Sequence, residues 1–88
     1  MKLVVTRAAA KFVNDPRVIP AKAATALLDD LRRIAADPYG DHPQAKPLRG
    51  HPGLFRVRHG DWRAAYVLDT ASDTMRVLWV MHRKDAYE

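Results

Sequence analysis

The segment 54–69 contains three closely spaced arginines, Arg56, Arg58 and Arg63. A guanidinium group presents a planar fork of donors that suits phosphate oxygens, so clustered arginines are typical of phosphate binding. On an exposed face the same side chains would simply be solvated, and like charges opposite each other across a hairpin cost roughly a few tenths of a kcal/mol. The hairpin alone therefore fits two interpretations, a phosphate site and a solvated face.

The end of the chain adds further groups of this kind. His82, Arg83 and Lys84 follow the last apolar run, and Tyr87 is the penultimate residue. We predict that this strand ends beside the cationic hairpin and brings Arg83 and Tyr87 close to its arginines. A basic patch that includes a tyrosine and a histidine can bind RNA and act chemically on it.

Other chemistries find little support in the sequence. Asp61 and Asp85 stand near these cations without a glutamate partner, which disfavours a paired-carboxylate mechanism. The chain contains no cysteine and no Gly-rich phosphate loop. Its histidines do not follow a metal-ligand spacing; they are His42, His51, His59 and His82. We therefore predict no metal and no cofactor.

The charge balance points to a polyanionic partner. The formal net charge is +5 and the pI is about 10.0. The excess lies between Lys46 and Lys84, where eight basic residues stand against three acids, Asp61, Asp69 and Asp73. The basic residues are Lys46, Arg49, Arg56, Arg58, Arg63, Arg76, Arg83 and Lys84. Because the chain lacks a signal-type start and a long apolar run, we expect a soluble cytoplasmic protein.

The first half of the chain reads as one strand followed by two helices. Residues 2–6 form a short β-branched run, and Thr6 is placed to cap a helix that ends at the Asp15–Pro16 step. A longer helix is predicted from Pro20 to Ala36, with an apolar stripe at helical spacing that packs into the core.

The second half reads as a hairpin and a buried strand. Residues 37–53 are rich in Pro and Gly and cannot hold a long regular element. Strands on either side of a Gly60–Asp61 turn would pair Arg58 with Arg63 and direct Phe55, Val57, Ala64 and Tyr66 toward the helices. A near-continuous apolar strand follows over 74–82, and Trp62 and Trp79 are interpreted as core residues.

These elements predict one domain over residues 1–88, of the α+β class. The order is β-α-α-β-β-β, with the helical pair packed on one face of a small, mainly antiparallel sheet.

Two stretches of the chain give it a family resemblance. They are KPLRGHPGLFRVRHGDWRAAYVLD and VLWVMHRKDAY. Together they resemble the Leu-(Arg/Lys)-Gly turn, the basic β-hairpin and the C-terminal His-Arg-basic-acidic-x-Tyr signature of the RelE/ParE superfamily of type II toxin–antitoxin toxins. The resemblance is closest to the RelE-like members, and it covers nearly the whole chain in element order.

The resemblance implies a metal-independent, ribosome-dependent mRNA endonuclease. Such enzymes cut the codon in the ribosomal A site by attack of a 2′-hydroxyl on the adjacent phosphate, which inhibits translation. The residues that match the family's catalytic positions are Arg58, Arg63, Arg83 and Tyr87. Those that match RNA-binding positions or add cations beside them are Lys46, Arg49, Arg56, His82 and Lys84.

The sequence departs from the family at two of these positions. Arg56 and Arg58 stand where the best-known members carry lysine, and arginine can clamp phosphate but hardly transfers protons because it stays charged. Tyr87 is therefore the candidate base, with base stacking as its alternative role, and His82 is an auxiliary candidate.

The resemblance also implies partners. These are the ribosome with its rRNA and mRNA, and a cognate antitoxin that folds over the toxin in a hetero-oligomer. Two alternatives remain open at this point: a ParE-like inhibitor of DNA gyrase, and a catalytically inactive binding partner or corepressor. The complete tail signature favours the nuclease, because ParE-like members typically lack it.

Overall fold

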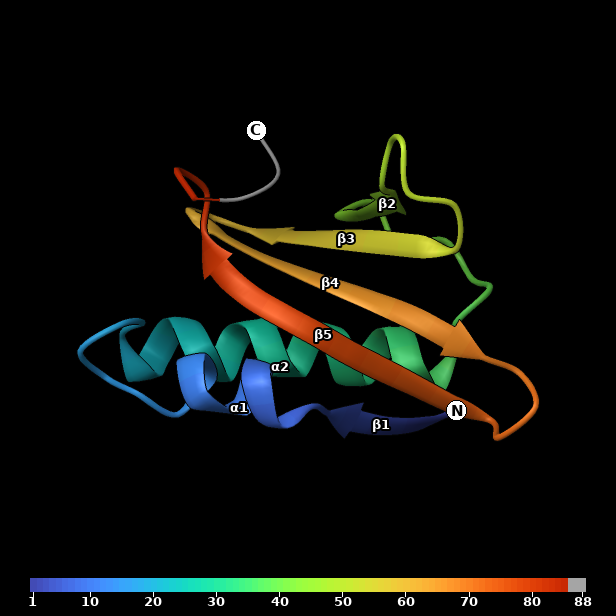
Figure 1. Ribbon diagram of the computed structural model, residues 1–88, viewed down its shortest axis with the longest axis horizontal. Coiled ribbons are helices and arrows are strands. Elements are labelled where there is room, and N and C mark those ends of the chain that lie inside the picture. The colour runs from blue at the N-terminus through green and yellow to red at the C-terminus, as the bar shows by residue number, and fades with distance from the viewer. Residues whose placement is uncertain (86–88) are drawn as a thin grey trace.

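Two helices lie against a five-stranded sheet in the computed structural model of the protein, which describes residues 1–85 (Figure 1). The elements are β1 (Lys2–Val5), α1 (Arg7–Val13), α2 (Ala21–Ala36), β2 (Ala45–Pro47), β3 (Leu54–His59), β4 (Trp62–Asp69) and β5 (Thr74–His82). The strand order is β1-β5-β4-β3-β2, with β1 parallel to β5 and every other pair antiparallel. The predicted α+β class and mainly antiparallel sheet are confirmed.

Strand β2 is the one strand that the sequence did not predict. It is three residues long and pairs with β3, with Lys46 opposite Arg56 and Pro47 opposite Phe55. Proline cannot donate a ladder hydrogen bond, so it is tolerated only at an edge such as this one. The proline-rich segment 37–53 therefore adds a fifth strand to the four expected, although it holds no long element.

Helix α1 is fixed to the end of the sheet through Thr6. The Thr6 hydroxyl accepts a hydrogen bond from the Ala9 amide at 3.4 Å and donates one to the Val77 carbonyl at 2.8 Å. One side chain therefore caps the helix, as predicted, and also ties it to β5. The helix ends at Val13, just before the Asp15–Pro16 step.

Helix α2 contributes more buried apolar residues to the core than helix α1 does. Its buried apolar stripe packs against Val57 of β3, Tyr66 of β4 and Val77 of β5. The stripe consists of Ala24, Leu27, Leu31, Ile34 and Ala35. Within residues 1–85, no helix is both long and apolar enough to cross a membrane.

A β-bulge in β5 changes which face of the sheet its side chains occupy. Ala65 pairs with Trp79, but the next residue, Tyr66, pairs with Val77, so Leu78 is the extra residue. The bulge reverses the alternation of side chains along the strand. Trp79 therefore lies on the face of the sheet away from the helices, outside the apolar core cluster. The interpretation of Trp79 as a core residue is wrong, whereas Trp62 does pack against the core.

The double role of Thr6 can be tested by mutation. We expect Thr6→Ala to lower the free energy of unfolding by about 1–2 kcal/mol, because both the cap and the link to β5 are lost. Thr6→Ser keeps the hydroxyl and should retain most of the stability. Urea unfolding monitored by tryptophan fluorescence measures both, and equal losses in the two variants would contradict this role.

Candidate nucleic-acid interface

The β3–β4 hairpin presents its arginines as predicted. Arg58 pairs with Arg63, Arg56 with Ala65 and His59 with Trp62, around a two-residue turn that begins at Gly60 with a φ of 57°. A positive φ is accessible to glycine without strain. The pairing confirms the predicted register, and the three arginines share the face of the sheet opposite the helices.

Arg63 resolves the like-charge conflict that the register creates. Its side chain is buried, with the residue 7% exposed, and its Nη1 donates to the carbonyl oxygens of Gly60 at 2.7 Å and Trp62 at 2.9 Å. The carbonyl dipoles of the turn thus stabilise the charge of Arg63, whereas Arg58, its cross-strand partner, is exposed. Neither of the two interpretations from the sequence anticipated this structural role.

The end of β5 meets the hairpin turn, as expected. The Arg83 amide donates to the Asp61 carbonyl at 2.7 Å, and the Arg83 Nε lies 3.4 Å from the Asp61 carboxylate. Figure 1 shows the red end of β5 at the same corner as the β3–β4 turn. Arg83 therefore joins Arg58 and Arg63 at this corner, whereas Tyr87 lies outside the described residues and its role stays a prediction.

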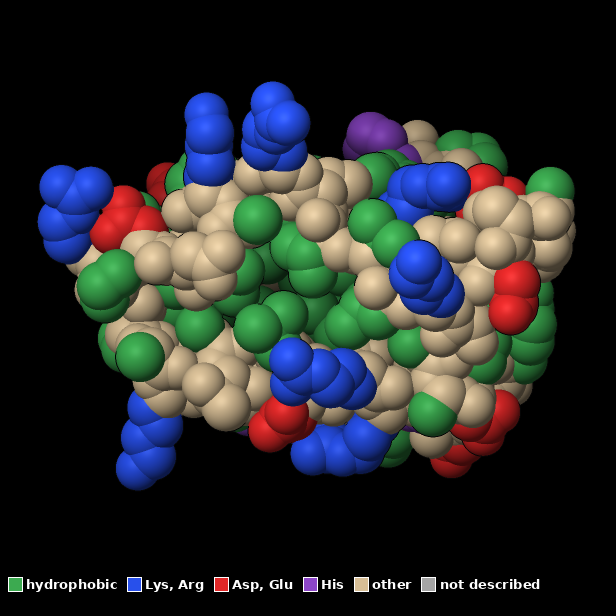
Figure 2. Space-filling view, turned by 90° about the horizontal axis from the view of Figure 1, so that it is seen from below, with side chains coloured by type: hydrophobic (Ala, Val, Ile, Leu, Met, Phe, Trp, Pro, Cys, Tyr) green, Lys and Arg blue, Asp and Glu red, His purple; other side chains and the backbone are tan. Residues whose placement is uncertain are grey.

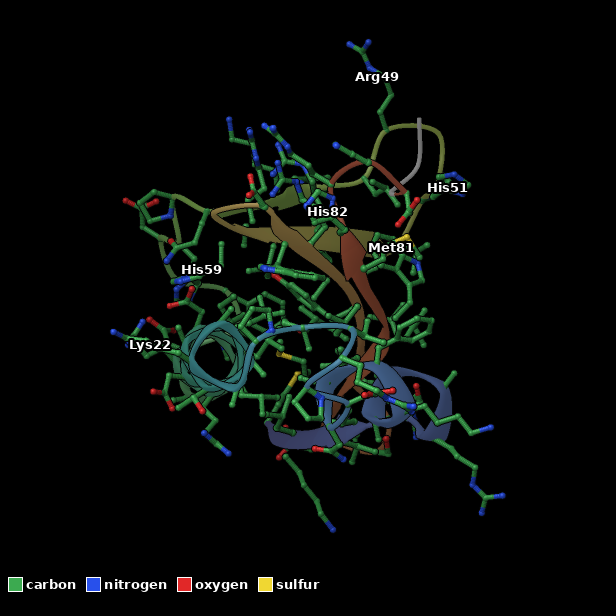
Figure 3. All side chains as sticks on the ribbon, turned by 90° about the vertical axis from the view of Figure 1, so that its left-hand side faces the viewer. Lys22, Arg49, His51, His59, Met81 and His82 are labelled. Atoms are coloured by element: carbon green, nitrogen blue, oxygen red, sulfur yellow. The ribbon has the colours of Figure 1, made fainter. Side chains whose placement is uncertain are left out.

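His82 faces the other side of the sheet from the arginines. It pairs with Trp62 across β4 and β5, and the two rings pack edge to face with centroids 5.1 Å apart. Its Nδ1 accepts a hydrogen bond from the Lys84 amide at 3.2 Å. In Figure 3, Met81 and His82 lie on opposite sides of β5, so the auxiliary candidate His82 is turned away from Arg58.

A buried carboxylate connects the hairpin to helix α2. Asp30 accepts from the Arg33 guanidinium at 2.6 Å and lies 3.0 Å from the Nδ1 of His59, the last residue of β3. Its side chain is 8% exposed. Figure 3 shows His59 reaching from the sheet to α2. The sequence did not predict this contact, because the two residues are 29 positions apart and no local sequence pattern relates them.

The predicted RNA-binding residues Lys46, Arg49 and Arg56 come together at a second place. They line one pocket of about 500 Å³ at the β2–β3 edge, together with His51. His51 was not singled out in the sequence, although it stands in the same turn as Arg49. Lys84 is exposed beside Arg83. The cations thus form two groups, one at the hairpin turn and one at the β2–β3 edge.

Other ionisable groups have structural partners. Hydrogen bonds from Arg76 and then from Ser72 lower the pKa of Asp69, and Arg76 Nη1 lies 2.6 Å from that carboxylate. Burial raises the pKa of Tyr66, whose ring stacks on Phe55 at 5.3 Å, so this tyrosine is poorly suited to act as a base. Over residues 1–85, no three His, Asp or Glu side chains cluster in a way that could hold a metal ion.

A separate, apolar hollow lies on the side of the helices. It has a volume of about 330 Å³, and its lining includes Leu3 and Val5 of β1, Val13 of α1, and Leu28 and Arg32 of α2. Figure 2 shows apolar side chains gathered in this hollow, with basic side chains around it. The apolar residues that line this hollow are half-buried or buried, and Arg32, which is paired with Asp29, lies among them.

Comparison with known families identifies the chain. The family model described as the ParE toxin of type II toxin–antitoxin systems matches residues 4–87. The chain belongs to this toxin family. The resemblance to the RelE/ParE superfamily is therefore confirmed. No protein among curated sequences matches this toxin.

The fold of this toxin is similar to that of several toxins of known structure. The RelBE2 toxin–antitoxin complex from Mycobacterium tuberculosis has a TM-score of 0.73 at 25% identity, covering 93% of this chain and 96% of that one. A YoeB/ParE toxin from Agrobacterium tumefaciens has a TM-score of 0.76 at 20% identity, covering 93% and 98%. The intact RelBE complex of E. coli has a TM-score of 0.75 at 17% identity, covering 92% and 94%.

The two paired arginines should respond differently to truncation. We expect Arg63→Ala to lower the free energy of unfolding by about 1–3 kcal/mol, because two carbonyl oxygens of the turn lose their donor. Arg58→Ala removes only an exposed cation and should change it by less than about 0.5 kcal/mol. Urea unfolding measures both, and equal midpoints would show that Arg63 has no structural role.

The link between α2 and the hairpin can be tested against a matched neighbour. Asp30→Ala should lower the free energy of unfolding by about 1–3 kcal/mol, because Arg33 and His59 lose a buried acceptor. Asp29→Ala breaks an exposed pair with Arg32 and should cost at most about 1 kcal/mol. Amide exchange at the end of β3 should accelerate only in the Asp30 variant; the same rate in both would argue against the link.

Proposed function

We propose that this toxin is a metal-independent endoribonuclease that enters the ribosomal A site and cleaves mRNA there. The observation that supports the proposal is the convergence of Arg58, Arg63 and Arg83 at one corner of the molecule, where the Asp61 carbonyl binds the Arg83 amide. Phosphoryl transfer depends mainly on positioning and on stabilisation of developing charge, which guanidinium groups supply.

The proposed reaction is attack of a 2′-hydroxyl on the adjacent phosphate. The new bond joins the 2′-oxygen to phosphorus and the bond to the 5′-oxygen breaks, which leaves a 2′,3′-cyclic phosphate and a 5′-hydroxyl. Arg58 and Arg83 are exposed and would contact the phosphate oxygens. Arg63 is buried, so it would act by holding the turn and adding positive potential beneath the site.

The proton of the 2′-hydroxyl needs an acceptor that the arginines cannot provide, because guanidinium groups stay charged. We assign this role to Tyr87, four positions after Arg83. Tyrosine ordinarily has a pKa near 10, and adjacent cations lower it toward a value useful in a base. The 5′-oxygen leaves with a proton from solvent or from the same tyrosine.

A second candidate function follows from the family model itself, which is that of ParE toxins. In this alternative the toxin inhibits DNA gyrase by binding, and the cations of the hairpin corner serve recognition without chemistry. The two functions differ in their dependence on Tyr87, because binding alone needs no base.

We also propose a cognate antitoxin as partner and the cytoplasm as the place of action. The similar structures from M. tuberculosis and E. coli are toxin–antitoxin complexes. The apolar hollow between β1, α1 and α2 would accept apolar side chains of the antitoxin. The resulting assembly would be a hetero-oligomer.

The nuclease proposal is tested by toeprinting an mRNA on programmed ribosomes with the purified toxin. We expect cuts at A-site codons by the wild-type protein, reduced about a hundredfold in Arg83→Ala and in Tyr87→Phe. Lys22→Ala alters an exposed cation at the start of α2, in the helical layer and not on the face of the sheet that carries the arginines, and should cut normally.

Intact mRNA with folded wild-type protein would overturn the nuclease. Inhibition of gyrase supercoiling by the wild type and by Tyr87→Phe alike would then establish the second candidate. Normal cutting by both variants would reject the assigned residues.

A further inference from the structure

The β-bulge in β5 turns an aromatic side chain to the face of the sheet that carries the arginines. Without the extra residue Leu78, strict alternation from the core residue Val77 would direct Trp79 toward the helices. With the bulge, Trp79 lies on the opposite face, and so does Met81, which points away from α2 in Figure 3. Both side chains are half-buried. Bulges are common beside functional sites, where they redirect a side chain in this way.

The bulge is held in place by Thr6. The Thr6 amide donates to the Val77 carbonyl oxygen at 3.1 Å. Its hydroxyl lies 2.8 Å from the same oxygen and 3.3 Å from the carbonyl oxygen of Leu78. Because one residue binds both carbonyl groups at the bulge, Trp79 is positioned in the free protein. A ligand of Trp79 therefore loses less affinity to ordering its site.

The cross-strand register joins this apolar surface to the cations. Arg56 pairs with Ala65 and Ala65 with Trp79, so the arginine and the tryptophan are two strand spacings apart, roughly 10 Å. Ala65 is small and fully buried, and it adds little bulk between them. Arg58 and Met81 are related in the same way one row further along. On this face, the row along β3 is thus cationic and the row along β5 is apolar.

Such a surface matches the two sides of a nucleic-acid strand. Its phosphates suit arginine, and its bases have flat apolar faces that stack on aromatic side chains. A strand with its phosphates over β3 directs bases toward β5. An apolar peptide would cover Trp79 and Met81 but would bring no negative charge to Arg56 and Arg58, so charge complementarity favours the nucleic acid.

We propose that Trp79 is the stacking platform for one base of the RNA strand and makes the toxin favour a purine at that position. A purine is preferred because its ring face is larger, and stacking strength sets such preferences. The flexible Met81 side chain widens the same surface. The inference rests on the proposed function, which supplies the RNA, and adds base selection to it.

The test uses the intrinsic fluorescence of full-length toxin without ribosomes. The chain has two tryptophans, so Trp62→Phe leaves only Trp79, and Trp79→Phe leaves only Trp62, which packs against the core on the helical side. The probes are purine, pyrimidine and abasic trinucleotides with the same phosphates, all 2′-O-methylated so that they cannot be cleaved. We expect the purine probe to quench Trp79 and not Trp62, and the abasic probe to quench neither.

Affinity is measured in parallel from the anisotropy of a fluorophore attached to each probe. Wild-type toxin should bind the purine probe more tightly than the pyrimidine probe. Trp79→Ala should lower affinity for the purine probe about tenfold and leave affinity for the abasic probe unchanged. Trp62→Phe is the matched control and should bind all three probes like the wild type. Urea midpoints establish that each variant is folded, and quenching in Trp62→Phe tests the proposal with Trp79 intact.

Several results would overturn the proposal. They are quenching of Trp79 by the abasic probe, equal quenching of both tryptophans, equal affinity of the wild type for purine and pyrimidine probes, an equal loss for all probes in Trp79→Ala, and no binding of the purine probe. Cutting of mRNA on ribosomes without quenching of Trp79 would reject the platform and leave the nuclease standing. Selective quenching by a toxin that leaves mRNA intact would support the platform and reject only the cleavage.

Discussion

The candidate interface depends on the way in which Arg63 is bound within the β3–β4 turn. Two arginines opposite each other would ordinarily weaken a hairpin, yet here one of them donates to the Gly60 and Trp62 carbonyl oxygens. This arrangement stabilises the turn and leaves Arg58 exposed beside it. The Asp61 carbonyl of the same turn then receives the Arg83 amide, so the end of β5 is positioned by the hairpin as well. A single turn thus organises side chains from β3, β4 and the segment after β5.

The distribution of acidic residues separates the structural cations from those available to a ligand. On the helical side and at the far end of the sheet, aspartates accept from arginines at short distances, as with Asp30 and Arg33 or Asp69 and Arg76. At the β2–β3 edge the charges lie side by side without such partners within residues 1–85. The cations at this edge are therefore available to attract a polyanion.

Local patterns in the sequence predicted much of the fold. The Gly60–Asp61 turn fixed the hairpin register, and the apolar stripe of α2 fixed its buried face, because both signals come from neighbouring residues. The contact of His59 with Asp30 is non-local, and no propensity relates the two. The bulge at Leu78 was hidden for a different reason: every residue around it is apolar or compatible with a strand, so the alternation shows no break. The hydrogen bonds of the Arg63 side chain likewise depend on the positions of two carbonyl oxygens, which only the folded hairpin provides.

The parallel pairing of β1 with β5 has a consequence for how the toxin is made. Lys2 lies opposite Thr74, so the first strand of the chain finds its partner only in the last one. Strand β5 also lies between β1 and β4 and contributes Met75, Val77 and Val80 to the core. During synthesis, the N-terminal strand and both helices emerge before any of these partners exist, and long-range strand pairing forms slowly. The core of this toxin can therefore assemble only after residues 74–82 have been synthesised.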